Sequence, residues 1–259
     1  MENQLLTGGR EGKIALNKGR IVRPANPWTK DVHAFLRFLK QKGFENVPVP
    51  YGVNGDGKEE VSFVEGVVYN DCLPDVVLRE DNLLAAARLL RRYHDAGAEY
   101  AATLAGGETW MLPGQTPAEV MCHGDFAPYN VTFVDGRVSG MIDFDTLHPG
   151  PRVWDIAYGV YRWVPFVSPG NPDFRYEVGE QIRRMKAFAD AYGMTAEQRG
   201  ALPGMMIRRL ETLIAYMRQQ TAQGNEDVAR NVEDGHLRLY LEDVAYLTRH
   251  QQEMLMGLM

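Results

Sequence analysis

Hydrophobic and polar positions divide this chain into a strand-rich beginning and a helical end. Short apolar runs broken by glycine at 5–25 favour a hairpin. VPVPYGV and VSFVEG, on either side of the polar turn NGDGKEE, favour a second hairpin. Between them, at 29–42, apolar residues recur every three or four positions, which predicts an amphipathic helix. Thr29 is its expected N-cap, and Gly43 is its expected end.

The remainder is mostly helical, with one strand-like interruption. Residues 81–97 have helical spacing, whereas 98–117 contain glycines and prolines without a period and predict a loop. Strand character returns at 121–145. Three further helices are expected beyond about residue 174, with Gly193 and Gly224 between them and Pro203 displacing the start of the second: 174–192, 196–223 and 227–256.

These patterns predict an α+β protein with two lobes. The first, at 1–66, is small and β-rich, and the second, at 67–259, is larger and mainly helical. The hinge is expected near 66–70. A cleft between two such lobes is a usual place for a ligand.

Composition narrows the possible function classes. The chain has 259 residues, of which 45% are hydrophobic, enough for a packed core. The net charge of −6 gives no basic field for nucleic acid or an anionic membrane. The two cysteines form no Cys-x-x-Cys pair, so a zinc cluster or disulfide framework is not expected. The polar N-terminus does not resemble a signal peptide, and no apolar run approaches the ~18 residues of a membrane span, so we expect a cytoplasmic protein.

Chemistry concentrates in MCHGDFAPYNVTFVDGRVSGMIDFDTLHPGPRVWDIAY, residues 121–158. Asp-Gly at 135–136 lies between two strand-like runs and predicts a two-residue hairpin. That hairpin places Asn130 opposite Met141, so Asp143, two residues further on, shares a face with Asn130. Diagonal neighbours on one face lie ~7–8 Å apart, so both side chains can reach a common ion.

An amide oxygen and a carboxylate at that separation suit Mg²⁺, which prefers oxygen ligands. Asp125 precedes Asn130 by five residues, on the loop that enters the hairpin. A carboxylate there can face the same site without binding the metal. Phosphoryl transfer requires this division: one aspartate orients the acceptor hydroxyl, while an asparagine and a second aspartate hold the metal.

The motif His-Gly-Asp-x-x-x-x-Asn at 123–130 resembles that of aminoglycoside phosphotransferases and the related choline- and homoserine-type kinases. Ile-Asp-Phe-Asp at 142–145 is similar to the metal-binding segment of that family. The resemblance implies a protein-kinase-like fold, with Asp125 as catalytic base and His123 shaping its loop. It implies Mg²⁺ held by Asn130 and Asp143, ATP or GTP as the nucleotide, and a hydroxyl of a small molecule as the acceptor.

The first lobe resembles the family more loosely. Gly8, Gly9 and Gly12 lie where the nucleotide-covering loop is expected, although an ordinary turn is an equal alternative. Arg23 stands where the family has a phosphate-contacting lysine; the alternative is a surface arginine beside a proline. The segment around Glu65 resembles the hinge whose backbone binds the purine.

Three further acidic positions have open alternatives. The helix after Arg23 should offer an acidic partner, and Asp31 or His33 lies near the expected turn, but no glutamate does. Asp155 is expected at a helix start, either near the acceptor or in a structural role there. Asp145 either supports the metal ligands or is solvated in a loop.

The expected reaction is transfer of the γ-phosphoryl group of ATP or GTP to a hydroxyl of a small molecule. One rival is a kinase of the same fold acting on choline, homoserine or a sugar. Another is a nucleotide-binding module without transfer activity. A protein kinase is disfavoured, because the first lobe is short and no Ala-Pro-Glu segment closes an activation loop. The sequence gives no signal of the oligomeric state.

Overall fold

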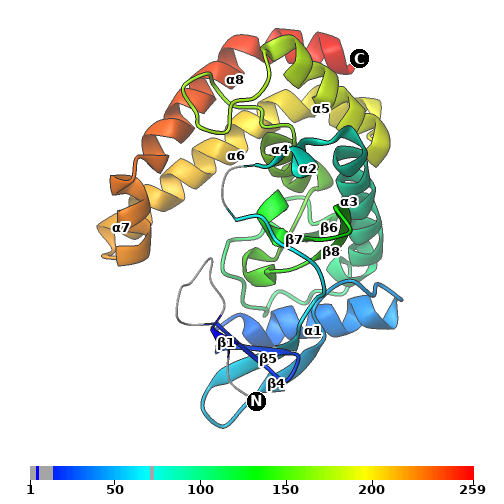
Figure 1. Ribbon diagram of the computed structural model, residues 1–259, viewed down its shortest axis with the longest axis vertical. Helices are drawn as coiled ribbons and strands as arrows, with labels where there is room; N and C mark the ends of the chain where they lie inside the picture. Colours follow the sequence, from blue (N-terminus) through cyan, green and yellow to red (C-terminus); the bar gives the residue numbers. More distant parts are fainter. Residues whose placement is uncertain (1–3, 6–13, 71–72) are drawn as a thin grey trace. The chain divides into compact units, whose positions relative to one another are not determined.

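The computed structural model describes residues 4–5, 14–70 and 73–259 (Figure 1). By contacts, the chain divides into two compact units. Unit 1 comprises Met1–Val77 and Leu89–Arg152, and unit 2 comprises Leu78–Arg88 and Val153–Met259. The α+β class is confirmed, with an antiparallel sheet near the N-terminus and a mostly helical C-terminal part. The lobe boundary at residue 66 stays a prediction.

Unit 1 begins with a five-stranded antiparallel sheet in the order β1-β2-β3-β5-β4. Both predicted hairpins are confirmed. The turn between β2 and β3 is Lys18-Gly19, whose φ angles of 51° and 76° are those of the tight turn that matches strand twist. The strands are β1 (Gln4–Leu5), β2 (Ala15–Asn17), β3 (Arg20–Pro24), β4 (Pro50–Val53) and β5 (Lys58–Ser62).

Helix α1 (Thr29–Gln41) follows β3, contacts β4 and lies along this sheet in Figure 1. It ends just before Gly43 (φ 77°), as predicted. Thr29 is not its N-cap: Trp28 takes that position, and the Thr29 hydroxyl accepts a hydrogen bond from the Asn26 N–H instead. The predicted apolar face is buried, and comprises Val32, Phe35, Leu36 and Leu39.

The rest of unit 1 holds two small two-stranded sheets. One pairs β7 (Val131–Val134) with β8 (Arg137–Met141), and the other pairs β6 (Val120–Cys122) with β9 (His148–Gly150). The sequence did not predict β9. The helix expected at 81–97 is α3 (Glu80–Ala101), preceded by a short α2 (Asp75–Leu78).

Unit 2 is formed mainly by helices, with α8 packed along both α5 and α6 (Figure 1). Gly193 and Gly224, both with positive φ, end helices as predicted. The single helix predicted at 227–256 is wrong, because Gly235 (φ 91°) divides it. Pro203 does not displace the start of α6, which Thr195 caps. The helices are α4 (Arg152–Trp163), α5 (Val178–Tyr192), α6 (Ala196–Ala222), α7 (Glu226–Glu233) and α8 (His236–Leu258).

A buried carboxylate organises the interior of unit 2. Asp243, on α8, accepts hydrogen bonds from the Tyr161 hydroxyl (2.8 Å), the Ser168 N–H (2.7 Å) and the Asn171 amide (2.8 Å). Burial, followed by the charge of Asp243, raises the pKa of Tyr161 well above its usual value. These bonds fix the loop after α4 to α8. None of the helices described is long and apolar enough to cross a membrane.

Candidate functional site

The β7–β8 hairpin departs from the predicted register. Its turn forms as expected, but the pairing shifts between Thr132 and Phe133, where β8 has one extra residue. The predicted pairing of Asn130 with Met141 is therefore wrong. The Asn130 carbonyl instead accepts a hydrogen bond from the N–H of Ile142 (2.9 Å).

The backbone at Asp143 is also irregular. Asp143 has φ 58° and ψ 70°, in the left-handed region that aspartate tolerates better than most residues. The regular alternation of side chains stops there, so the shared face with Asn130 no longer follows from strand geometry. The Asp143 side chain is 48% exposed, and its carboxylate is therefore accessible to a ligand.

Asp125 and Asn130 are joined directly. The amide nitrogen of Asn130 donates to the carbonyl and to Oδ2 of Asp125, both at 2.9 Å. Since only the NH₂ group can donate to these oxygens, the amide orientation is fixed, and the Asn130 oxygen is the atom free to bind a cation. The Tyr129 hydroxyl donates to the other carboxylate oxygen of Asp125 (2.7 Å). The carboxylate of Asp125 is thus held at both oxygens.

His123 connects the Asp125 loop to the segment after β8. Its Nε2 lies 2.9 Å from the carbonyl of Ile142, which can only accept, so Nε2 carries the proton. Its Nδ1 is then the acceptor for the Asp125 N–H (3.4 Å). The Thr146 hydroxyl donates to the His123 carbonyl (2.8 Å), and the imidazole packs 4.8 Å from the Phe144 ring. These contacts support the predicted loop-shaping role.

Arg23 meets an acidic partner that the sequence did not reveal. Glu59 lies directly opposite it on β5, and its carboxylate accepts a hydrogen bond from Arg23 Nε. Nη1 of Arg23 donates to Asp143 (3.0 Å) and Nη2 donates to Asp145 (2.7 Å). His33, on α1, lies 2.9 Å from the other oxygen of Glu59. The arginine therefore links the N-terminal sheet to the predicted metal segment.

Electrostatics stabilise this cluster in its charged form. Burial raises the pKa of Glu59, but the hydrogen bond from His33 and the charge of Arg23 outweigh it, so the pKa lies below its usual value. Burial lowers the pKa of Arg23, whereas the carboxylates of Asp145, Asp143 and Glu59 together raise it above its usual value. Both groups are thus ionised at neutral pH.

Asn130 and Asp143 offer an amide oxygen and a carboxylate, which are the kinds of ligand that Mg²⁺ prefers. Among residues 14–70 and 73–259, no group of three or more His, Cys, Asp or Glu side chains is arranged to hold a metal ion. Mg²⁺ needs no such cage, since it is usually bound through one or two carboxylates plus phosphates and water.

A profile of the phosphotransferase enzyme family (APH) matches residues 97–202. The match includes Asp125, Asn130 and Asp143, whose arrangement is described above. Over these residues the chain has the sequence pattern of this family. It is a small-molecule phosphotransferase.

Two proteins of known name are similar to this phosphotransferase along most of its length. The trifolitoxin immunity protein of Rhizobium leguminosarum bv. trifolii is 27% identical over 213 residues, 78% of each chain. The homoserine kinase of Granulibacter bethesdensis is 24% identical over 238 residues, 77% of this chain and 71% of that enzyme.

A solved structure supports the fold. An amicoumacin kinase in complex with AMP-PNP, Ca²⁺ and Ami has a TM-score of 0.62 at 12% identity, covering 90% of this chain and 88% of that one. The α+β fold of the phosphotransferase is thus that of kinase-like structures of this family.

The structure describes only some of the other residues that the sequence of the phosphotransferase singled out in the first lobe. Gly8, Gly9 and Gly12 lie outside the described residues. Glu65 is exposed, and the segment around it runs beside β7, where Val67 pairs with Phe133. Gly66 allows this approach, since a Cβ there would lie 2.8 Å from the Cβ of Thr132.

Asp31 forms a hydrogen bond with a backbone N–H, and Asp155 is buried in a helix. Asp31 accepts a hydrogen bond from the N–H of Thr109 (2.9 Å) and lies outside the Arg23 cluster. Asp155 is in the first turn of α4, within unit 2, and is completely buried. Its burial favours the structural alternative.

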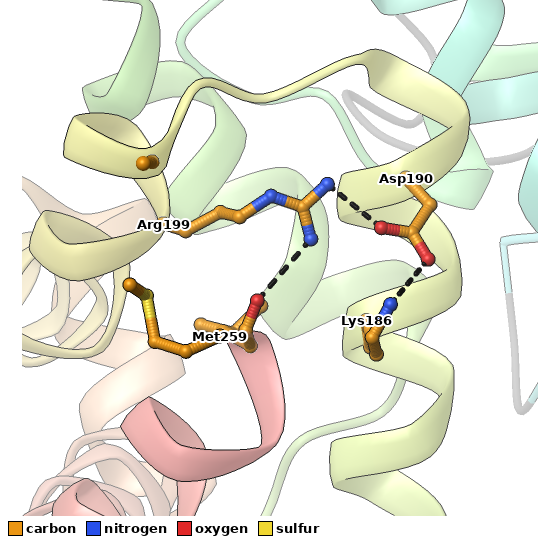
Figure 2. A pocket seen from close by; sticks show the side chains of 6 residues that line it. Lys186, Asp190, Arg199 and Met259 are labelled. Atoms are coloured by element: carbon orange, nitrogen blue, oxygen red, sulfur yellow. Dashed lines mark hydrogen bonds and ion pairs between the residues drawn. The ribbon is translucent and has the colours of Figure 1, made fainter.

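A pocket of about 340 Å³ in unit 2 contains none of the motif residues of the phosphotransferase (Figure 2). Figure 2 shows Arg199 between Asp190 and the C-terminal end of α8. Asp190 binds both Arg199 and Lys186, each at 2.7 Å, so both cations at the pocket already have an anionic partner. This pocket is therefore no rival to the site in unit 1.

Sequence reasoning missed two side chains that contact the site of the phosphotransferase. His33 was noted, but its partner Glu59 was not. Glu59 lies two residues before Val61, so both side chains are on the same buried face of β5. A charged residue on the apolar face of a predicted strand was therefore a signal in the sequence that Glu59 needs a partner. Tyr129 lies inside the motif, between Asp125 and Asn130, and only the folded loop shows that its hydroxyl reaches Asp125.

We expect Gly124→Ala to destabilise the phosphotransferase by about 1–3 kcal/mol. Gly124 has φ 82°, and a Cβ there would lie 2.4 Å from the carbonyl oxygen of Thr146. Urea unfolding measures the loss. Gly107→Ala is the matched control, since its Cβ would meet nothing within 4 Å. Equal midpoints for the two variants would contradict the tight packing of the Asp125 loop.

Proposed function

We propose that this phosphotransferase transfers the γ-phosphoryl group of ATP or GTP to a hydroxyl group of a small molecule. The observation behind the proposal is the Asp125–Asn130 pair. The carboxylate of Asp125 is held at both oxygens, while the amide of Asn130 presents its oxygen. A positioned carboxylate and a separate set of metal ligands are the two requirements of phosphoryl transfer.

Each residue then has one role. Asp125 accepts a hydrogen bond from the acceptor hydroxyl and takes its proton as the oxygen attacks the γ-phosphorus. The bond between the γ-phosphorus and the β,γ-bridging oxygen breaks, and the nucleoside diphosphate leaves. Tyr129 orients that carboxylate. Asn130 and Asp143 hold Mg²⁺, which neutralises charge on the phosphates when bound. His123 fixes the distance between the two loops that carry these groups, because it bonds to both.

The nucleotide has further contacts in the N-terminal part. Arg23 has five N–H groups, and its hydrogen bonds to described residues use three of them, leaving two for a phosphate. The backbone near Glu65 binds the purine, and the segment with Gly8, Gly9 and Gly12 covers the phosphates. An amicoumacin kinase of the same fold binds AMP-PNP with Ca²⁺, which supports a nucleotide with a divalent cation.

The acceptor is a small molecule with a hydroxyl group. Two similar proteins are a homoserine kinase and an amicoumacin kinase, so acceptors of both classes belong in a first screen. Choline and sugars are the other candidates. We place the reaction in the cytoplasm, where ATP and Mg²⁺ are present.

Mg²⁺ with ATP or GTP should raise the unfolding temperature more than the nucleotide with a chelator does. Binding to the folded state at 100 times the dissociation constant stabilises it by ~2.7 kcal/mol. Thermal unfolding with non-hydrolysable analogues of both nucleotides measures this. No shift at millimolar concentrations would exclude a working kinase site. A shift without transfer to any acceptor would leave the nucleotide-binding module.

The roles of the two aspartates should separate in Asp125→Asn and Asp143→Asn. Asparagine suits both, because Asp143 has positive φ and alanine would add strain there. Asp125→Asn should keep magnesium-dependent nucleotide binding and lose ~10²–10⁴-fold in transfer rate. Asp143→Asn should lose transfer and weaken the magnesium dependence of binding. Calorimetry and single-turnover transfer measure the two effects.

Asp135→Asn is the matched control for both variants. Asp135 lies at the turn of the same hairpin, is exposed and also has positive φ. It should behave like the wild type. If Asp125→Asn abolished magnesium-dependent binding while Asp143→Asn left it intact, the two roles would be reversed.

A further inference from the structure

The guanidinium of Arg23 occupies the place of a cation beside the predicted metal ligand. It bonds to Asp143, to Asp145 and to Glu59, and its side chain is 14% exposed. Glu59 and Asp145 are nearly buried, whereas Asp143 is half exposed. The same carboxylate of Asp143 is therefore available to solvent on one side and bound to arginine on the other.

The charges of this cluster do not balance. Three carboxylates surround one guanidinium, so negative charge outnumbers the charge of Arg23. An excess of negative charge among nearly buried groups is costly unless a cation compensates it. Asp143 is the member that such a cation can reach from solvent.

Two residues that make no described bond to Asp143, Glu59 and His33, hold Arg23 in position. Glu59 binds Nε, the inner end of the guanidinium, and His33 in turn binds Glu59. Glu59 cannot turn away without losing both bonds. The outer nitrogens, Nη1 and Nη2, consequently point to Asp143 and Asp145.

We propose that Arg23 is an internal counter-ion of the metal site, positioned by Glu59 and His33, and that it makes cation binding depend on the nucleotide. This inference rests on the proposed function, because Asp143 must be a metal ligand. Without nucleotide, the guanidinium competes with a divalent cation for Asp143. Nucleotide phosphates offer the guanidinium a second anion, which suits its planar fork, and release Asp143 to the metal. The two ligands then bind with positive coupling.

Mn²⁺ binding without nucleotide tests the counter-ion. Mn²⁺ accepts the same oxygen ligands as Mg²⁺, and its free concentration can be measured by electron paramagnetic resonance. Arg23→Gln should bind Mn²⁺ alone at least ~10-fold more tightly than the wild type, a difference of ~1.4 kcal/mol. Its affinity for Mn²⁺ with a non-hydrolysable ATP analogue should fall, since a phosphate contact is lost. The two changes have opposite signs, which simple damage to the site would not produce.

Arg20→Gln is the matched control. Arg20 lies on the same strand and also pairs with a glutamate, Glu60, but this pair is exposed and outside the cluster. Its Mn²⁺ affinity should equal that of the wild type. Should Arg23→Gln not fold, Arg23→Lys serves, because a lysine cannot span three carboxylates. It should bind Mn²⁺ more tightly than the wild type does.

The outcomes separate the two proposals. Suppose that the wild type binds Mn²⁺ with the ATP analogue, but that Arg23→Gln, or Arg23→Lys in its place, binds Mn²⁺ no more tightly than the wild type. The counter-ion role of Arg23 would then be wrong, and the proposed function would stand. If the wild type bound no Mn²⁺ with the analogue, the proposed function would fail, and the coupling with it.

A double-mutant cycle tests the positioning role of Glu59. Glu59→Gln should weaken binding of the ATP analogue with Mn²⁺, and this loss should disappear in the Arg23→Gln background, with a coupling of about 3-fold or more. Glu60→Gln, the next residue on β5, is the control and should show no coupling to Arg23. An equal loss from Glu59→Gln in both backgrounds would mean that Glu59 does not act through Arg23.

Discussion

The shared charge of Arg23 is the interaction on which the site of unit 1 depends. Glu59, Asp143 and Asp145 are acidic groups that would repel one another without it. Removing one partner from a buried set of charges is strongly destabilising, because the others remain desolvated and unpaired. The site is therefore a linked group of charges, in which a change to one member affects the others.

Around this charge, the backbone is irregular at several positions. The β7–β8 hairpin shifts register by one residue, Asp143 takes a left-handed conformation, and Gly124 packs against a carbonyl. Bulges and unusual dihedral angles recur at functional sites, because they aim side chains that a regular strand would direct elsewhere. The register shift and the left-handed residue lie within a few positions of each other.

Local signals in the sequence predicted the elements well and the cluster poorly. Helical spacing, glycine stops and the Asp-Gly turn each act within a few residues, and they gave α1, the two first hairpins and the hairpin at 131–141. The break at Gly235 was missed because apolar spacing continues on both sides of it. The extra residue in β8 was missed because it leaves the turn unchanged.

The Arg23–Glu59 pair could be predicted only from the pairing of distant strands. The two residues are 36 positions apart and meet only because β3 pairs with β5, across an intervening helix and β4. The motif around Asp125 was recognisable because its members are close in sequence. Sequence thus identified the chemical groups of the site, and the sheet order identified how Arg23 and Glu59 are brought together.

The pairing of β6 with β9 has a consequence for chain entropy. Val120 meets Gly150, so the ends of the segment that contains Asp125, Asn130 and Asp143 are brought together. Closing a loop costs only ~0.6 kcal/mol more for each doubling of its length, but the contact of Arg23 with Asp143 closes a loop of 120 residues, about four times as long. Closing the loop that carries the residues proposed for catalysis thus costs ~1.2 kcal/mol less than closing the loop between Arg23 and Asp143, which spans most of unit 1.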